Sequence, residues 1–547
     1  MPTLQFKGKS VIWNHHMTVP YHTLEHEATL DFQSEKAEGN RIVEGDNLVA
    51  LKALLPEYGG RVKCIYIDPP YNTGEEHWVY NDNVDSPVIR EWIGQEVGRD
   101  DLTRHDKWLC MMTPRLKLLN ELLRPDDGVI FLSIDDNEHA HLKQLCDEVF
   151  GPESFVATIP WRKRTAKSDV PFGVSQDMEW ILCYAKPGFV AGLATERKYH
   201  YTDDFPGEGW RLADLTKQTT AQERPNSAYD MVDPRTGKVY PYNPRRVWSV
   251  SRENFDAYYR RGKIVFPGAY DFLKITRPAY RVFEHEDREK ARRKYGTDTP
   301  TRAVSTHLPK EVGMTRDGNR EITELFGTKV FDNAKPHTLI KYLLSFATRE
   351  EDIVLDAFAG SGTTGHAVMA LNAEDGGRRR FVLIQMPENS EAEPEKNICR
   401  DITRERIVRT IGTYGYASGF AYLRIGQALD ADTLLGGELP SYETFARYLY
   451  YLAGGEHLDR PEAIDPSAWF VGTHHQRDIY LIYDEEMATL QTLALTWEIA
   501  EAMRRRSAER AIVVYAPACF VEEETLARMG IAFVSIPYNL LERTPGV

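Results

Sequence analysis

The sequence predicts an α/β protein with a doubly wound parallel sheet, a long inserted region and a smaller α/β domain towards its C-terminal end. Short apolar runs of strand length, such as 64–67 and 129–134, alternate with stretches of helical spacing. A second series of the same kind resumes near residue 331. Between the two series the helical period fades and turns multiply. We therefore expect one sheet whose two parts are separated by an insert.

The negative charge of the chain is unevenly distributed. Its 547 residues include 67 Lys plus Arg and 82 Asp plus Glu, for a formal net charge of -15. Residues 161–330 contain 31 basic and 23 acidic side chains, so one basic block lies in an otherwise acidic chain. An acidic surface repels polyanions, whereas a basic patch attracts them. The distribution keeps nucleic acid among the candidate partners, with a chance fluctuation as the alternative.

Neither the cysteines nor the hydropathy indicates a secreted or membrane protein. The six cysteines lie far apart without a C-x-x-C pair, so disulfide frameworks and zinc ribbons are not expected. The sequence contains no run of about 18 apolar residues, and its N-terminus has no signal pattern. We expect a cytoplasmic protein with buried free thiols and no membrane contact.

The strand predicted at 64–67 leads directly into Asp68-Pro69-Pro70-Tyr71. In open α/β sheets, ligands bind just beyond the carboxyl ends of the strands. The prolines end the strand and keep the chain extended, so a carboxylate, backbone carbonyls and a phenol ring can face one small planar group. This stretch predicts a pocket for a ring that bears an amino group. An ordinary proline-rich turn is the alternative.

Two acidic positions accompany this strand. Asp46 follows a short strand at 41–44 and precedes a helix, so it can cap that helix or accept from an amino group of a cofactor. The acidic run 135–138 also lies just before a helix, which favours capping over metal binding. We therefore predict no metal site. Residues 75–101 are polar and aperiodic, which predicts a loop beside the site.

The inserted region mixes aromatic and basic side chains. Arg and Lys pair with phosphates and guanine edges, and aromatic rings supply stacking faces, so the mixture suits a DNA-reading domain. Alternatively the aromatic residues form a small core of their own while the cations are solvated, and both interpretations can hold. The side chains concerned are Trp210, Tyr229, Tyr240, Tyr242, Trp248, Tyr258, Tyr259 and Phe266, among Arg211, Arg245, Arg246, Arg252, Arg260 and Arg261.

A glycine-rich turn, Gly360-Ser361-Gly362, follows the strand predicted at 352–356 and opens a helix. Such a turn lets the backbone approach a ligand while the helix N-terminus faces it. A P-loop would need Lys and Ser or Thr where this chain has His366-Ala367. A dinucleotide fingerprint fits formally through Gly365, but its acidic partner is not evident, because Gln385 ends the next strand. S-adenosylmethionine is the third candidate ligand.

The two motifs together resemble those of amino-methylating DNA methyltransferases. The stretch 356–362 resembles their S-adenosylmethionine-binding motif, and Asp68-Pro69-Pro70-Tyr71 resembles their catalytic motif. The catalytic motif comes first and a basic insert separates the two, which is the order of the β group. Phe331 with Lys335-Pro336 resembles the segment that closes over the methionine part of the cofactor. Gln385 departs from the pattern, since many relatives place a carboxylate there against the cofactor ribose.

Longer stretches resemble the modification subunits of type III restriction-modification systems, over most of the chain. The resemblance implies a permuted Rossmann-like methyltransferase sheet with an inserted target-recognition domain. The stretches are 133–138, 233–238, 402–407 and 514–520. The predicted domains are 1–160 for the catalytic half, 161–325 for the DNA-binding target-recognition insert, 326–430 for the S-adenosylmethionine-binding half and 431–547 for a C-terminal α/β interaction domain.

The implied activity is methyl transfer from S-adenosylmethionine to N6 of an adenine flipped out of double-stranded DNA. Asp68 and a carbonyl of Pro69 or Pro70 would hold the amino hydrogens, and Tyr71 would stack on the base. A homodimer and a helicase-nuclease restriction subunit are the implied partners. The implied cofactor-binding residues are Asp46, Phe331, Lys335, Asp356, Phe358, Gly360, Ser361, Gly362 and Thr363.

Several alternatives remain open. Relatives that methylate cytosine N4 commonly carry Ser at the position of Asp68, so the aspartate favours adenine. An orphan methyltransferase without a restriction partner and an inactive DNA-binding module are two further possibilities. A related motif also serves in methylation of protein glutamine side chains, and the basic aromatic insert favours DNA over that substrate.

Overall fold

The computed structural model describes residues 3–73, 103–165, 173–194, 197–296, 298–299, 301–388, 395–437 and 439–536. The loop predicted at 75–101 lies outside the described residues. The chain forms two compact units, one comprising Met1–Phe189 with Ser305–Val547 and the other Val190–Val304. We describe each unit by itself.

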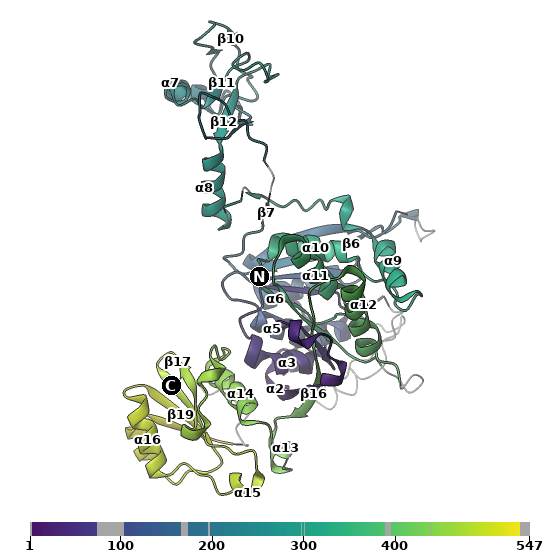
Figure 1. The fold of residues 1–547 in the computed structure, drawn as a ribbon, viewed down its shortest axis with the longest axis vertical. Coiled ribbons are helices and arrows are strands. Elements are labelled where there is room, and N and C mark those ends of the chain that lie inside the picture. Colours follow the sequence, from purple (N-terminus) through teal and green to yellow (C-terminus); the bar gives the residue numbers. More distant parts are fainter. Residues whose placement is uncertain are drawn as a thin grey trace. The chain divides into compact units, whose positions relative to one another are not determined.

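Within the described residues, the first unit is built on a nine-stranded sheet of order β1-β16-β2-β15-β14-β3-β4-β6-β5 (Figure 1). The strands from β16 to β4 in this order run parallel, and β1, β6 and β5 pair antiparallel at the two edges. The bounds are His22–His26 (β1), Arg41–Glu44 (β2), Cys64–Ile67 (β3), Val129–Ile134 (β4), Phe155–Arg162 (β5), Met178–Ala185 (β6), Ile353–Asp356 (β14), Arg380–Gln385 (β15) and Ala421–Ala428 (β16).

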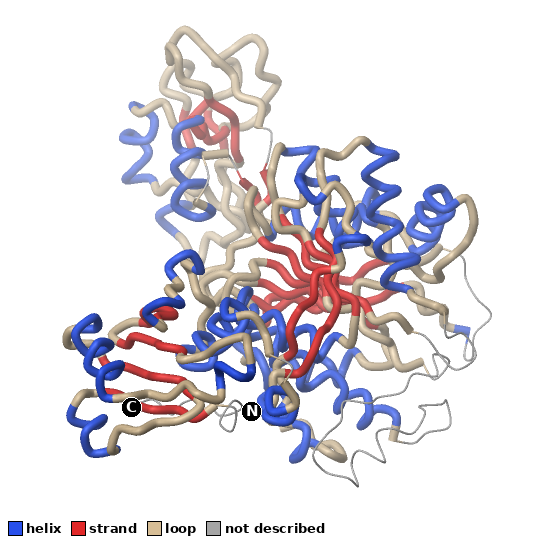
Figure 2. Tube along the Cα trace, turned by 60° about the horizontal axis from the view of Figure 1, so that its bottom comes forward, coloured by secondary structure: helices blue, strands red, loops and turns tan. Residues whose placement is uncertain are grey.

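Helices cover both faces of this sheet (Figure 2). In one group α3 and α6 pack against α5, and in the other α11 packs against α10 and α12, with α9 against α12. Because helices bury both faces, β3 and β4 are apolar and fully buried along their length. The bounds are Asn47–Tyr58 (α3), Arg104–Leu122 (α5), His139–Phe150 (α6), Thr315–Phe326 (α9), His337–Ala347 (α10), Thr363–Asp375 (α11) and Glu405–Tyr414 (α12).

The neighbouring strands β3 and β14 bring distant parts of the sequence together. They pair in parallel, with Val354 opposite Cys64 and Leu355 opposite Ile65, so their carboxyl ends lie at the same edge. From β3 the chain continues to β4, and from β14 it continues to β15 on the other side. Such a reversal of strand order is where open α/β sheets bind ligands. The predicted α/β fold is confirmed.

The second unit is shorter at both ends than the insert expected at 161–325. Strands β5 and β6 belong to the large sheet, and α9 packs on α12, so the flanks on both sides lie in the first unit. Strand β6 was not predicted, because this antiparallel strand of eight residues is flanked by polar and Pro-Gly segments and lacks the helix that normally follows a parallel strand.

The second unit has a small aromatic core. Five of the eight aromatic side chains singled out above are buried, so in this respect the core interpretation is correct. They are Trp210, Tyr229, Tyr240, Trp248 and Phe266. The elements are Leu193–Ala194 (β7), Trp210–Ala213 (β8), Met231–Val232 (β9), Val239–Tyr240 (β10), Phe255–Arg260 (α7), Ile264–Val265 (β11), Ala279–Phe283 (β12), Glu284–Tyr295 (α8) and Thr301–Arg302 (β13).

A small α/β domain completes the first unit. Its sheet has the order β17-β18-β19-β20, and its helix α14 packs on α3. The ring of Tyr448 stacks on Tyr21 at 4.4 Å, and the Tyr451 hydroxyl donates to Glu121 Oε2 at 2.6 Å. In the described part of the chain, every helix is too short or too polar to cross a membrane. The bounds are Tyr442–Gly454 (α14), Phe470–His474 (β17), Arg477–Leu481 (β18), Trp497–Ser507 (α16), Ala511–Ala516 (β19), Glu523–Arg528 (α17) and Ile531–Ser535 (β20).

Candidate functional site

The residues after β3 form a compact acidic corner. Asp68 follows the strand, and the Tyr71 hydroxyl donates back to its Oδ1 at 2.8 Å. Trp108 on α5 donates from Nε1 to the Pro70 carbonyl at 2.7 Å, which fixes the proline segment against the helix layer. Burial, with the nearby carboxylates, raises the pKa of Tyr71 well above its usual value, so the ring remains a neutral phenol. The structure thus brings the predicted catalytic residues together.

Lys335 reaches this corner from the segment before α10. Its Nζ donates to Asp68 Oδ1 at 3.0 Å, to Asp68 Oδ2 at 2.8 Å and to the Tyr71 hydroxyl at 2.9 Å. Burial alone would lower the pKa of Lys335, but the carboxylates of Asp68 and Glu179 raise it, so the side chain stays an ammonium. Lys335 was predicted to bind the cofactor. That role stays a prediction. In the structure the Lys335 ammonium instead contacts Asp68 and Tyr71 of the predicted catalytic motif.

Glu179 on β6 is a second carboxylate in the site, which the sequence did not reveal. Its side chain is 9% exposed, accepts from the Tyr71 hydroxyl at 3.1 Å, and pairs with Lys335 and Lys163 at 3.3 Å each. Burial alone would raise its pKa, but the two ammonium groups lower it. The only sequence cue was one acid at the start of the apolar run 180–185.

The glycine-rich turn lies at the end of the neighbouring strand, β14. Asp356 is buried and accepts from the Thr364 hydroxyl at 2.5 Å and from the Phe358 N–H at 3.0 Å, and burial raises its pKa to about 7. Gly360 has φ +51°, and a Cβ there would lie 3.2 Å from the Phe331 ring. Only glycine tolerates this conformation and contact without strain. The predicted residues 356–363 therefore form one tight turn, whose backbone we call the cradle.

The hydroxyls of Ser361 and Thr363 are bonded within the protein. Both accept from Nη1 of the buried Arg406 at 2.7 Å, and the Thr363 hydroxyl donates to the Lys335 carbonyl at 3.2 Å. These bonds tie the turn to the Lys335 segment. The two hydroxyls support the cradle, and their predicted contact with a cofactor stays a prediction.

Asp46 caps α3. Its Oδ1 accepts from the N–H groups of Leu48 and Val49 at 2.8 and 3.2 Å, and Arg115 donates to Oδ2 at 3.3 Å. The next residue, Asn47, donates from Nδ2 to the Ala357 carbonyl at 3.0 Å. Asp46 therefore lies beside the turn after β14 while its carboxylate organises the helix. Its cofactor role stays a prediction.

A carboxylate lies three residues beyond the unexpected Gln385. The Gln385 side chain accepts from the Gly360 N–H at 2.7 Å and donates from Nε2 to Glu388 at 2.8 Å. Burial raises the pKa of Glu388. Gln385 thus links the glycine turn to the carboxylate of Glu388. The sequence pattern did not indicate this carboxylate, because the family motif places it at the last residue of the strand and here it lies three residues later.

The acidic run before α6 supports the catalytic loop rather than only a helix end. Glu138 is fully buried and makes no capping bond. It accepts from Asn72 at 2.5 Å, and the Nδ1 atoms of His105 and His141 lie 2.6 and 2.8 Å from its oxygens. Because Asn72 follows Tyr71 directly, this network holds the end of the catalytic motif. The acidic run 135–138 was expected to serve the helix start, and the Glu138 side chain instead bonds to Asn72, His105 and His141.

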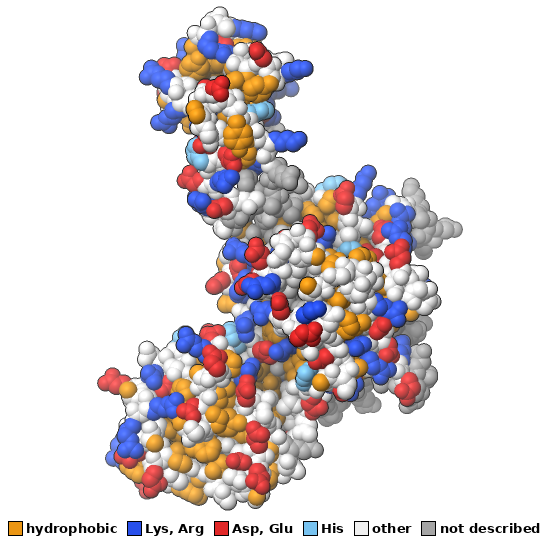
Figure 3. Space-filling view, viewed as in Figure 1, with side chains coloured by type: hydrophobic (Ala, Val, Ile, Leu, Met, Phe, Trp, Pro, Cys, Tyr) orange, Lys and Arg blue, Asp and Glu red, His pale blue; other side chains and the backbone are white. Residues whose placement is uncertain are grey.

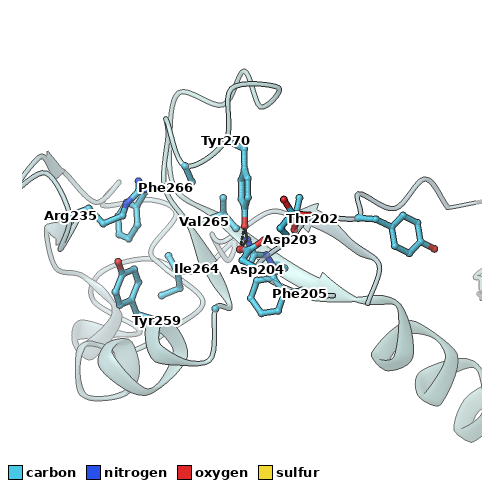
Figure 4. Close-up of a pocket in the computed structure, with 14 residues that line it drawn as sticks. Thr202, Asp203, Asp204, Phe205, Arg235, Tyr259, Ile264, Val265, Phe266 and Tyr270 are labelled. Atoms are coloured by element: carbon cyan, nitrogen blue, oxygen red, sulfur yellow. Dashed lines mark hydrogen bonds and ion pairs between the residues drawn. The ribbon is translucent and has the colours of Figure 1, made fainter. Parts of the chain in front are cut away.

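The second unit has a cavity of about 720 Å³, lined by its own residues (Figure 4). Arg281 is held over the rings of Phe205 and Trp210, at 4.3 and 4.2 Å from their centroids. The Tyr270 hydroxyl donates to Asp204 at the same wall. The cavity is therefore lined by both aromatic and charged side chains of the second unit.

The fold and the site together have the arrangement expected of the α/β methyltransferase class, because an acid-Pro-Pro-Tyr motif and a glycine-rich turn end adjacent parallel strands. Residues 62–395, more than half of the chain, match the family model described as DNA methylase. The chain belongs to the DNA methylase family.

Two curated relatives are named as enzymes of restriction-modification systems. The Mod subunit of the type III enzyme StyLTI from Salmonella typhimurium is 35% identical over 398 residues, which are 68% of this chain and 57% of that relative. The EcoPI Mod subunit of Escherichia phage P1 is 32% identical over 399 residues, 65% of this chain and 59% of the relative. The chain thus spans under three fifths of their length.

Among solved structures, the PvuII DNA methyltransferase (cytosine-N4-specific) aligns with 70% of this chain and 95% of its own. The identity is 13% and the TM-score 0.30, which is too low to support an inference.

Proposed function

We propose that the chain is a site-specific DNA methyltransferase that transfers a methyl group to adenine N6, as the modification subunit of a type III restriction-modification system. The observation that carries the proposal is the position of the Asp68–Tyr71 corner and the Gly360 turn at the ends of adjacent strands, β3 and β14. The Mod subunits among the relatives support this substrate and setting.

The residues around the turn after β14 fit S-adenosylmethionine as the methyl donor. A Cβ at Gly360 would lie 3.2 Å from the Phe331 ring, so the backbone of the turn and this ring lie close together and could both contact one ligand. Phe331 and Phe358 offer apolar faces, and Glu388 offers the carboxylate that would bind ribose hydroxyls. When bound, S-adenosylmethionine supplies a methyl group on a positively charged sulfur.

The chain's own part in the reaction is to prepare the amino group. The lone pair of the adenine amino nitrogen is delocalised into the ring, which makes it a poor nucleophile. Asp68 would accept one amino hydrogen, and we assign the other to the Pro69 carbonyl, since the Pro70 carbonyl accepts from Trp108. Holding both hydrogens favours a tetrahedral nitrogen and frees the lone pair. Positioning and electrostatics then carry the rate.

The target base would leave the duplex and stack on Tyr71, because a paired base cannot reach the Asp68 corner. The second unit would hold the DNA. Among its described residues, Arg245, Arg252, Arg260 and Arg261 are exposed and no carboxylate pairs with them. Figure 3 shows Lys and Arg side chains around the visible face of this unit. Such cations supply phosphate contacts.

The partners belong to the same proposal. We infer a separate restriction subunit, because the relatives are named as Mod subunits of type III restriction-modification enzymes. A homodimer is the second part of the proposal. The C-terminal domain offers exposed apolar side chains for contacts of this kind, with Trp497 53% and Phe520 80% exposed. Light scattering on the purified chain distinguishes a dimer from a monomer.

The decisive experiment incubates the chain with labelled S-adenosylmethionine and either duplex DNA or cell protein. We expect label in DNA, as N6-methyladenine at one sequence, which sequencing of modified bases in DNA from expressing cells identifies. Label at cytosine N4, or in protein alone, would overturn the proposed substrate. Absence of transfer to any substrate, with cofactor binding intact, would indicate a DNA-binding module.

A further inference from the structure

Two carboxylates of the site share one buried ammonium. Lys335 Nζ donates to both oxygens of Asp68, at 3.0 and 2.8 Å, and lies 3.3 Å from Glu179 Oε2. The Tyr71 hydroxyl lies between the acids, at 2.8 Å from Asp68 and 3.1 Å from Glu179. Lys163 pairs with Glu179 from the other side at 3.3 Å. Two negative and two positive groups thus balance each other.

The pairing of Asp68 conflicts with its proposed role. To hold the target amino group, the carboxylate must accept an N–H from the base, and both of its oxygens already accept from Lys335. An ammonium is a donor of the same kind as an amino group. The Lys335 ammonium uses two of the lone pairs of the carboxylate and offsets its charge, so the base meets a weakened acceptor unless the ammonium moves away.

Lys335 cannot simply release Asp68 into an unpaired state. Its side chain is 8% exposed, and a buried ammonium without a counter-charge is strongly unfavourable. Glu179, which is 9% exposed, already lies 3.3 Å from the same nitrogen. A short movement of Nζ away from Asp68 towards Glu179 would keep the charge paired throughout.

We propose that Glu179 is a positioning residue that takes over the Lys335 ammonium when the target amino group occupies Asp68. The proposal rests on the proposed function, since it requires an amino-bearing substrate at Asp68. Glu179 would act through Lys335 without contact with the base. The Tyr71 hydroxyl, bonded to both acids, would stay in place during the exchange.

The test is a double-mutant cycle with Glu179→Gln, Lys335→Met and the double variant. We expect Glu179→Gln to lower kcat/KM by about 100-fold, the scale of a misplaced catalytic group, with unchanged affinity for S-adenosylmethionine. Fluorescence of 2-aminopurine at the target position should show weaker capture of the flipped base. In the Lys335→Met background the added Glu179→Gln change should have little effect, because no ammonium remains to be moved. Glu179→Asp should restore part of the activity.

Asp147→Asn is the matched control. Asp147 also binds a lysine and a tyrosine, Lys143 at 2.7 Å and Tyr184 at 2.7 Å, but on α6 outside the site. We expect it to leave base capture unchanged. Wild-type rates in Glu179→Gln, or equal losses with and without Lys335, would overturn the inference. If the unaltered chain transfers no methyl group to DNA, the proposed function itself fails.

A second measurement does not depend on turnover. Reductive methylation of lysines, followed by mass spectrometry of peptides, reports how often Lys335 is a neutral amine. Glu179→Gln should raise labelling of Lys335 severalfold and leave that of Lys341, which pairs with Glu374 at 2.7 Å, unchanged. Unchanged labelling of Lys335 would show that Glu179 does not act on it, which overturns the inference.

Discussion

Lys335 Nζ lies 2.8 Å from Asp68 Oδ2, although 267 positions of sequence separate the two residues. The contact joins the segment before α10 to the end of β3, so the predicted catalytic motif is bonded to the part of the chain that leads into the glycine-rich turn. Thr363 strengthens this link, because its hydroxyl donates to the Lys335 carbonyl at 3.2 Å. Lys335 is therefore bonded to both motifs, through its side chain to Asp68 and through its carbonyl to Thr363, although the insert separates the motifs in sequence.

The first prediction concerns Asp68 and Tyr71. Asp68→Asn should lower methyl transfer at least about 100-fold, because an amide cannot supply the charge that draws the amino hydrogen. Tyr71→Ala should lose transfer through the missing stacking face, whereas Tyr71→Phe should retain more of it. Equilibrium dialysis should show unchanged cofactor affinity in all three variants. Full transfer by Asp68→Asn would contradict the assigned role.

The second prediction concerns the backbone cradle. Gly360→Ala places a Cβ at φ +51° and 3.2 Å from Phe331, so cofactor affinity should fall about tenfold and the chain should lose roughly 1–2 kcal/mol of stability. Gly376→Ala is the matched control, since Gly376 has φ +74° with open space around it. It should show the backbone strain alone. Equal cofactor affinity in the two variants would show that the backbone at Gly360 does not contact the cofactor.

Particular residues show how far the sequence could predict this structure. The strand at Val129–Ile134 and the helix after the acidic run 135–138 lie where they were expected, because an apolar run between turns and a helical period are local properties. Cys399–Arg404 forms a π-helix just before α12, which no local pattern in the sequence indicates. The pairing of Glu179 with Lys335 depends on where β6 meets the distant segment before α10, and no local pattern encodes that contact.

The third prediction concerns pH. Burial raises the pKa of Asp356 from 3.8 to about 7, so the folded chain favours the neutral acid. The resulting stability is fully present below pH 3.8 and is lost as the pH rises through about 7, at a cost of at most about 4 kcal/mol. Asp356→Asn should therefore gain stability relative to the wild type between pH 5 and pH 8 in urea unfolding.

Asp127 provides a control of opposite sign. Burial alone would raise its pKa, but hydrogen bonds and charges from Lys63 and Arg124 lower it. Its contribution is present above the ordinary pKa of the acid and is lost as the pH falls below it, so Asp127→Asn should be less stable than the wild type by a constant amount between pH 5 and pH 8. A parallel pH dependence in the two variants would show that Asp356 is not held neutral.

The last prediction concerns DNA binding by the second unit. Arg260 ends α7 and Arg261 follows it, and both are exposed without a carboxylate partner among the described residues. If they contact phosphates, replacing both with alanine should weaken DNA binding on all sequences alike and reduce the slope of log K against log salt by about 2. The aromatic core should remain intact, because neither side chain belongs to it.

Arg288→Ala is the matched control, because it removes one positive charge from the same unit at a side chain that is already paired with a carboxylate. Arg288 is 54% exposed but pairs with Glu284 at 2.6 Å, so it is a cation of similar exposure that is already neutralised. Fluorescence anisotropy with target and unrelated duplexes at several salt concentrations should show the wild-type slope for this variant. An unchanged slope in the double alanine variant would place the DNA on another face of the unit. A loss confined to the target duplex would instead assign the two arginines to base edges, because phosphate contacts carry no sequence information.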